Sequence, residues 1–133
     1  MANNRILENG SGVALGDVNG DGWCDLYFAR LEGPNELYFN RGGWRFERQP
    51  EAGGAPCADQ PSTGTVLADV DGDRDLDLLV NGLGFGTRLF LNDGVGHFTE
   101  SNQHRLSKRL GATSLALADI DGDGDLDLYV TNY

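Results

Sequence analysis

The sequence predicts an all-β fold of propeller type, in which small sheets of four antiparallel strands, the blades, follow one another along the chain. The first observation is a segment of apolar and acidic residues that occurs three times at nearly equal intervals. The second is that Gly, Asn and Asp divide the copies into apolar runs of strand length. The third is the period itself, because four strands in about 50 residues are typical of a propeller blade. A β-helix, the alternative repeat fold, requires a much shorter period.

The leading aspartates Asp17, Asp69 and Asp119 align the three copies. At matching distances from these aspartates, the first two copies share a Leu, an Asn and a Phe: Leu37 and Leu89, Asn40 and Asn92, Phe46 and Phe98. We therefore expect one domain, with repeats over residues 10–61 and 62–111 and half a repeat over 112–133. Residues 1–9 are a candidate extra strand, because residues 4–9 are similar to residues 87–92.

Each unit is expected to form its strands in a fixed order. We expect first strands at residues 12–18, 64–70 and 113–120, and second strands at 25–30, 77–82 and 127–132. Third strands are expected at 35–40 and 87–92, and fourth strands at 44–48 and 96–100. The nearly continuous apolar run 76–80 predicts a strand buried on both faces. No stretch has a convincing helical period; the basic segment 101–111 is interpreted as a solvated loop, with one helical turn as the alternative.

The acidic segments predict three metal-binding loops: loop 1 (residues 17–25), loop 2 (69–77) and loop 3 (119–127). Side-chain oxygens stand at positions 1, 3, 5 and 9 of each loop, and the carbonyl oxygen of position 7 would complete the shell. Hard oxygen ligands at alternate positions of a tight loop suit Ca²⁺. The candidate ligands are Asp17, Asn19, Asp21, Trp23 and Asp25; Asp69, Asp71, Asp73, Asp75 and Asp77; and Asp119, Asp121, Asp123, Asp125 and Asp127. We expect about three Ca²⁺ ions per chain.

Glycine at position 4 of each loop lets the backbone curl around an ion. Position 6 is Gly22 in loop 1 and Gly124 in loop 3, but it is Arg74 in loop 2. Arg74 therefore requires an unusual backbone angle or a modified turn. We expect loop 2 to bind Ca²⁺, although it is the least regular of the three.

Two other interpretations of the acidic loops are weaker. An EF-hand loop needs a bidentate Glu at position 12 and flanking helices. Position 12 is Phe28, Val80 or Val130 here, and the flanking segments are predicted strands. A solvated turn would explain one Asp/Gly cluster, but not three copies with the same ligand spacing.

The charge balance favours cations or basic partners. The chain has 21 acidic and 10 basic residues and a net charge of −11. Loops 1 to 3 contain 13 of the acidic residues, so without metal their like charges repel. We therefore expect Ca²⁺ to have a structural role.

The negative charge argues against nucleic acids and anionic membranes as partners, and no apolar run reaches the roughly 18 residues of a membrane span. The first residues also lack the apolar core of a secretory signal, so any such signal is expected to have been removed.

The two cysteines are too few to fix the redox compartment. Cys24 and Cys57 either form a disulfide between adjacent blades, or remain thiols with Cys24 buried and Cys57 exposed.

The sequence contains no pattern of a catalytic site: no nucleophile elbow, phosphate loop or zinc spacing is present. His97 is interpreted as a surface residue, and His104 lies in the basic segment without a carboxylate or cysteine pattern around it. Trp23 and Trp44 could stack on sugars, but packing within the blades is the preferred interpretation of Trp44. We expect a protein that is not an enzyme.

The pattern D-x-[DN]-x-D-x-x-x-D between two apolar strands resembles the FG-GAP/VCBS repeat, a family that includes the calcium-binding blades of integrin α-chain propellers. The fuller pattern, in residues 10–28, 35–47, 62–81, 87–100 and 115–133, is closest to propeller proteins related to cartilage acidic protein and to bacterial UnbV-type proteins. The resemblance implies a secreted or surface propeller with Ca²⁺ in the loops of one face. It places the ligands at positions 1, 3, 5 and 9 of loops 1 to 3.

The chain differs from this family in size. Propellers close with four to eight blades, and about two and a half are present here. The sequence therefore predicts either a fragment of a longer propeller or a homodimer that closes a six-bladed ring, with residues 1–9 completing a half blade of the partner. The expected function is extracellular, cell-surface or periplasmic binding or adhesion, with a protein or carbohydrate ligand that the residues do not identify. The alternatives are an accessory propeller of a larger secreted enzyme and a fragment without independent activity.

Overall fold

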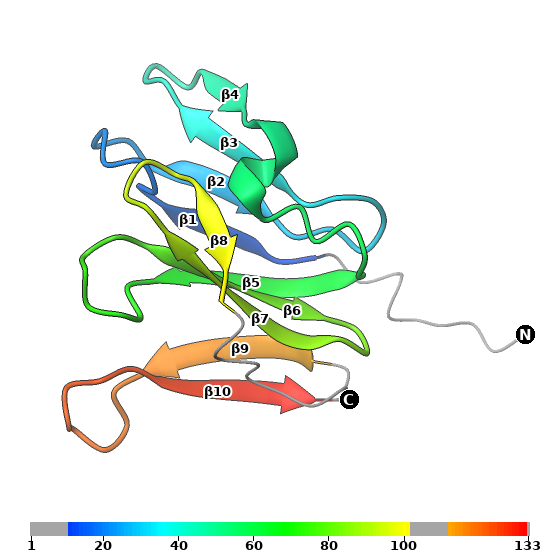
Figure 1. Cartoon of the computed structure of the whole chain (residues 1–133), viewed down its shortest axis with the longest axis vertical. Helices are drawn as coiled ribbons and strands as arrows, with labels where there is room; N and C mark the ends of the chain where they lie inside the picture. Colours follow the sequence, from blue (N-terminus) through cyan, green and yellow to red (C-terminus); the bar gives the residue numbers. More distant parts are fainter. Residues whose placement is uncertain (1–10, 102–111, 133) are drawn as a thin grey trace, which may run out of the picture.

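The computed structural model describes residues 11–101 and 112–132, which form three antiparallel sheets in succession (Figure 1). Blade 1 contains β1 (Val13–Gly16), β2 (Asp25–Phe28), β3 (Glu36–Asn40) and β4 (Phe46–Arg48). Blade 2 contains β5 (Ser62–Ala68), β6 (Asp77–Gly82), β7 (Gly86–Asn92) and β8 (Phe98–Glu100). Blade 3 contains β9 (Ala112–Ala118) and β10 (Asp127–Asn132). Strands adjacent in sequence are adjacent in each sheet, so the predicted all-β fold with four-stranded blades is confirmed.

Several strands are shorter than the apolar runs that predicted them. β1 ends at Gly16 because the Val18 N–H donates to the Asp25 carboxylate, at 3.1 Å, instead of to a neighbouring strand. β4 and β8 begin later than predicted, at Phe46 and Phe98. The turns before them account for the difference, since the Arg41 N–H donates to the Arg45 carbonyl at 2.8 Å and closes the first turn.

The main core lies between blades 1 and 2. Alternate side chains of each sheet point to its two faces, as the pleat requires, and the core forms where blades 1 and 2 face each other. Blade 1 contributes Ala14, Val18, Tyr27, Leu37 and Phe39, and blade 2 contributes Leu78, Val80, Phe90 and Phe98. Every residue of β6 is buried, because blades 1 and 3 cover its two faces. The prediction that residues 76–80 contain a strand buried on both faces is therefore confirmed for β6.

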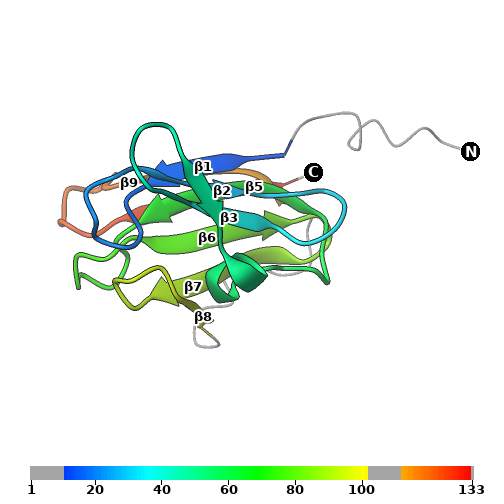
Figure 2. The same cartoon turned by 90° about the horizontal axis from the view of Figure 1, so that it is seen from above.

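The connection from blade 1 to blade 2, residues 49–61, is a packed segment that we call the strap. It contains the short 3₁₀ element η2 (Pro50–Gly54), which lies beside β3 and β8 (Figure 2). No helix was expected here, because so short an element shows no helical period. The φ values of Glu51 and Ala52 are both +47°, in the left-handed region. A Cβ on Gly54 would lie 2.3 Å from the Phe98 carbonyl oxygen, so only glycine fits between the strap and β8.

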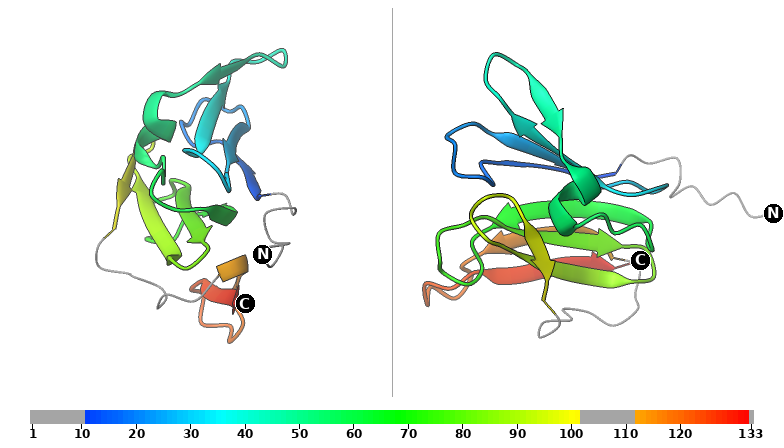
Figure 3. Two further views of the ribbon diagram at one scale, coloured as in Figure 1. Left: turned by 90° about the vertical axis from the view of Figure 1, so that its right-hand side faces the viewer. Right: turned by 45° about the horizontal axis from the view of Figure 1, so that its top comes forward.

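The first strands of the three blades are neighbours, since β5 contacts both β1 and β9. Figure 3 shows the three sheets following one another around this inner row of strands. Loops 1, 2 and 3 all emerge at one end of the blades, on the left of Figure 1. The candidate extra strand over residues 1–9 and His104 fall outside the described residues, and so does almost all of the basic segment 101–111. Among the described residues, no helix has the length and apolar character to cross a membrane.

Candidate metal centre

The aspartates at position 9 anchor the acidic loops to the sheets. Asp25 and Asp77 are completely buried at the start of β2 and β6. Asp25 Oδ2 accepts the Val18 N–H at 3.1 Å, and its Oδ1 accepts the Asn40 N–H at 2.8 Å. The Asp77 carboxylate accepts the equivalent bonds from the N–H groups of Val70 and Asn92, at 3.0 and 2.9 Å. The carboxylate therefore joins the loop to the end of the third strand.

The aspartates at position 1 close the loops on themselves. Asp69 accepts the Gly72 N–H on Oδ1 at 2.8 Å and the Arg74 N–H on Oδ2 at 3.0 Å. Asp17 and Asp119 make the same pair of bonds, to positions 4 and 6 of loops 1 and 3. Bonds of this local type favour turns over strands. The repeated sequence thus folds into the same loop three times.

Three carboxylates converge in each of loops 2 and 3, namely those at positions 1, 3 and 9. Each carboxylate offers an oxygen within 4.8 Å of the others: Asp69, Asp71 and Asp77 in loop 2, and Asp119, Asp121 and Asp127 in loop 3. One Ca²⁺ binds its oxygen ligands at about 2.3–2.6 Å, so two ligands of one ion lie no more than about 5 Å apart. The donor set therefore fits a hard cation in both loops. Loop 1 has an amide oxygen at position 3, from Asn19.

The other predicted ligands lie beside these groups. Asp73 and Asp123, at position 5, are not part of the converging sets, and each Oδ1 accepts the N–H of position 7 at 2.9 Å. Asp21 does the same in loop 1 and also lies 3.8 Å from the Arg41 guanidinium. In loops 1 and 2 the position 7 side chains lie against the β3–β4 and β7–β8 turns, where Trp23 faces Gly42 and Asp75 faces Gly94.

Position 6 has left-handed backbone in every loop. The φ value is +85° at Gly22, +96° at Gly124 and +80° at Arg74. Of the two alternatives predicted for Arg74, an unusual backbone angle or a modified turn, the unusual angle is present. A residue with a side chain costs roughly 1–2 kcal/mol in this region, so loop 2 is strained where loops 1 and 3 are relaxed.

The position 9 aspartates of loops 1 and 2 place negative charge where the sheets exclude water. Burial raises the pKa of Asp77 above its ordinary value, against the opposing effect of its two backbone N–H bonds. The same balance raises the pKa of Asp25. The pKa of Asp75 is raised by desolvation and then by the neighbouring carboxylates, of which Asp73 is the strongest. A divalent cation would relieve this repulsion.

Asn40 and Asn92 support the loops in a way that sequence reasoning missed. The Asn92 side-chain amide donates to the carbonyls of Val18, at 2.8 Å, and Leu76, at 3.1 Å, and its Oδ1 accepts the Gly96 N–H. It thus ties loop 2 to the β7–β8 turn and to loop 1 of the neighbouring blade. Asn40 likewise donates to the Cys24 carbonyl at 3.1 Å. The available signal was their recurrence at the same distance from the leading aspartate of each repeat.

The cysteines and one tryptophan differ from expectation. Cys24 and Cys57 are not bonded to each other, and their exposure is the reverse of that predicted for free thiols. Cys57 is buried because the strap carries it between the blades, and burial raises its pKa to about 11. Trp44 does not pack within the blade: it is 89% exposed at the β3–β4 turn, with a φ of +60°.

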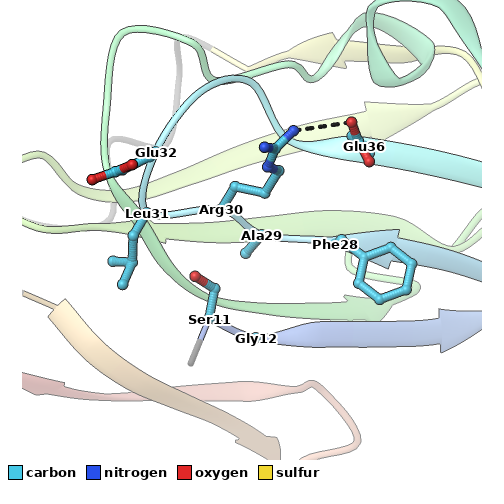
Figure 4. Close-up of a pocket in the computed structure, with 8 residues that line it drawn as sticks. All are labelled: Ser11, Gly12, Phe28, Ala29, Arg30, Leu31, Glu32 and Glu36. Atoms are coloured by element: carbon cyan, nitrogen blue, oxygen red, sulfur yellow. Dashed lines mark hydrogen bonds and ion pairs between the residues drawn. The ribbon is translucent and has the colours of Figure 1, made fainter. Parts of the chain in front are cut away.

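A hollow of about 500 Å³ lies at the end of blade 1 opposite to loop 1, beside the Arg30–Glu36 ion pair (Figure 4). It is lined by Ser11, Gly12, Phe28, Ala29, Arg30, Leu31, Glu32 and Glu36. On blade 2, one repeat further along the chain, the strap occupies the equivalent place: the Leu83 N–H donates to the Pro61 carbonyl, and Arg88 pairs with Asp59 at 2.8 Å. The hollow is therefore equivalent to a place that the strap fills on blade 2.

Comparison with protein families gives a match over most of the chain. The model described as FG-GAP-like repeat matches residues 17–80 and 84–130. A search of curated proteins finds no match.

Proposed function

This chain belongs to the FG-GAP-like repeat family, and from that premise we propose that it is a calcium-binding propeller module whose loops 1, 2 and 3 each hold one ion. The observation that carries the proposal is the convergence of three carboxylates within 4.8 Å in loops 2 and 3. Oxygen donors alone, in a loop of high charge, suit Ca²⁺ better than a transition metal. The carbonyl of position 7 and water would supply further ligands.

The proposed role of the ion is structural. A bound Ca²⁺ would neutralise carboxylates that otherwise repel one another in the loop. Extracellular modules bind Ca²⁺ with dissociation constants of about 10⁻⁴–10⁻³ M. At roughly 1 mM Ca²⁺ and a constant near 10⁻⁴ M, each site stabilises the folded state by about 1.4 kcal/mol. Three such sites supply about 4 kcal/mol, a large part of the roughly 5–15 kcal/mol that stabilises a typical domain.

The proposed biological role is binding or adhesion outside the cytoplasm, on a cell surface, in a periplasm or in the extracellular space. Repeats of this family usually occur there, and millimolar Ca²⁺ fills weak sites in such compartments. Trp44 and Trp23 are exposed near the loop end of blade 1, where they could contact a protein or carbohydrate ligand. The alternatives from the sequence, an accessory propeller of a larger secreted enzyme and a fragment without independent activity, share the same calcium sites.

Calorimetric titration of the chelated protein with Ca²⁺ tests the metal proposal. We expect three ions per chain, and two for each of the variants Asp69→Ala and Asp119→Ala. The matched control is Asp59→Asn, which changes an exposed acidic residue outside the loops and should retain three ions. The proposal is wrong if the parent takes up no Ca²⁺, or if the loop variants bind as many ions as the control. Release of products from polysaccharides by this chain alone would exclude a pure binding role.

A further inference from the structure

Blade 1 has an apolar face that nothing covers within residues 11–101 and 112–132. We call it the open face; it consists of Val13, Leu15, Leu26, Phe28, Tyr38 and Phe46. Leu15 is 62% exposed and Phe28 is 39% exposed. The register pairs join these residues side by side, Leu15 with Leu26 and Leu26 with Tyr38. A continuous apolar patch of this kind marks an interaction surface rather than a solvated one.

The same positions on blade 2 form a buried interface. The equivalent residues of the second repeat are Thr65, Leu67, Leu78, Val80, Phe90 and Phe98, and they have the same cross-strand register as the open face. Leu78 and Val80 are completely buried, and Phe90 is nearly so. Blade 1 covers them. The interface between blades 1 and 2 therefore shows that the inner face of another blade can pack on such a surface.

The covering side of blade 1 has a duplicate at the other end of the chain. Ala14 and Tyr27 are register partners that bury themselves against blade 2. Ala116 and Tyr129 stand at the equivalent positions of blade 3 and are register partners too. Both are exposed, Tyr129 by 64%. Blades 1 and 3 thus present the two halves of a second blade interface.

Side-chain volumes at this second interface compensate. In blade 1, a Cβ added to Gly16 would lie 2.6 Å from a terminal methyl group of Leu76, so the Leu76 side chain would have to shift to admit a larger residue. At the corresponding place on the unused surfaces, Ala118 replaces Gly16 and the smaller Cys24 replaces Leu76. Ala118 adds a methyl group on the blade 3 surface, and Cys24 provides a smaller side chain on the blade 1 surface. Close packing favours this kind of match.

We propose that blade 3 of one copy packs against the open face of blade 1 in a second copy, head to tail, with Ala116 and Tyr129 covering Leu15, Leu26 and Phe28. This inference rests on the propeller part of the proposed function and not on the calcium sites. The contact joins two different surfaces, so it either closes a ring or continues into a longer assembly. A ring of two copies joins the two surfaces twice.

The test is the molar mass in solution, by sedimentation velocity in about 1 mM Ca²⁺, the concentration that fills weak sites. We expect at least twice the 14.3 kDa of one chain. Leu15→Glu and Tyr129→Glu each destroy one surface of every copy, so each variant should sediment as a monomer. An equimolar mixture of the two retains one intact contact between unlike chains, and it should recover a species of about twice the monomer mass. Val95→Glu, which changes an exposed apolar residue in the β7–β8 turn, should leave the parent assembly intact.

Cross-linking gives a second measurement that does not depend on surface disruption. Ala118→Cys places a thiol opposite Cys24 of the neighbouring copy, and mild oxidation should yield covalent dimers. Val95→Cys should yield none above the parent level. A monomeric parent, a mixture that stays monomeric, or a Tyr129→Glu variant that keeps the parent mass would each overturn the inference. If no Ca²⁺ binds and the mass still doubles, the calcium proposal fails while this inference stands.

Discussion

Loops 2 and 3 have the same aspartate spacing but different support. Asp77 is completely buried, and both of its oxygens accept backbone N–H groups, one of them from Asn92 at the end of β7. Asp127 is exposed, and in the described part of the chain it accepts only the Ile120 N–H. The convergence of three carboxylates is nevertheless the same. Ligand spacing is thus a local property of the loop, whereas the rigidity of the site comes from the third strand of its blade.

Removal of Ca²⁺ should have the largest effect on stability, because it acts on loops 1, 2 and 3 at once and not on one of them. Excess chelator should lower the free energy of unfolding by about 4 kcal/mol relative to roughly 1 mM Ca²⁺. For a domain of this size the melting temperature should fall by on the order of 10–20 °C. Calorimetric melts of one sample in both conditions measure the difference. An identical melting temperature in chelator would contradict the structural role.

Replacement of the position 9 aspartates separates their role in anchoring the loop to the sheet from their proposed role as metal ligands. In chelator, Asp77→Ala leaves the buried N–H of Asn92 and the part-buried N–H of Val70 without acceptors, so we expect a loss of about 1–3 kcal/mol. Asp127→Ala, at an exposed site, should stay within about 0.5 kcal/mol of the parent. Urea unfolding of both variants gives the two values. Equal losses would show that the third strand does not distinguish the loops.

Exchange of the side chains at position 6 has the smallest expected effect. Arg74→Gly relieves a left-handed backbone strain and should stabilise the protein by about 0.5–1 kcal/mol. Gly124→Arg should introduce the same strain into loop 3 and destabilise it by a similar amount. Thermal melts in Ca²⁺ measure both. The prediction fails if the two changes have the same sign.

The repeat made most of the fold predictable. Strand order, the loop position and the left-handed angle at Arg74 all follow from local residue types at a fixed period. The anchoring role of Asp77 did not, because its place in the loop suggests a metal ligand, and only the packed blade shows that both of its oxygens accept backbone N–H groups. The burial of Cys57 and the exposure of Trp44 depend on how the strap and the β3–β4 turn lie against the sheets. No local sequence pattern indicates that packing.

The strap carries one further consequence. Gly54 touches the backbone of β8, and the Tyr27 hydroxyl donates to the Ala55 carbonyl at 2.6 Å. The connection is therefore a wedge of fixed shape and not a flexible tether, despite its glycine and proline content. A connection of fixed shape sets the angle between two consecutive blades. That angle decides how many blades complete a circle. Lengthening the strap would change the curvature of the assembly before it changed the stability of any single blade.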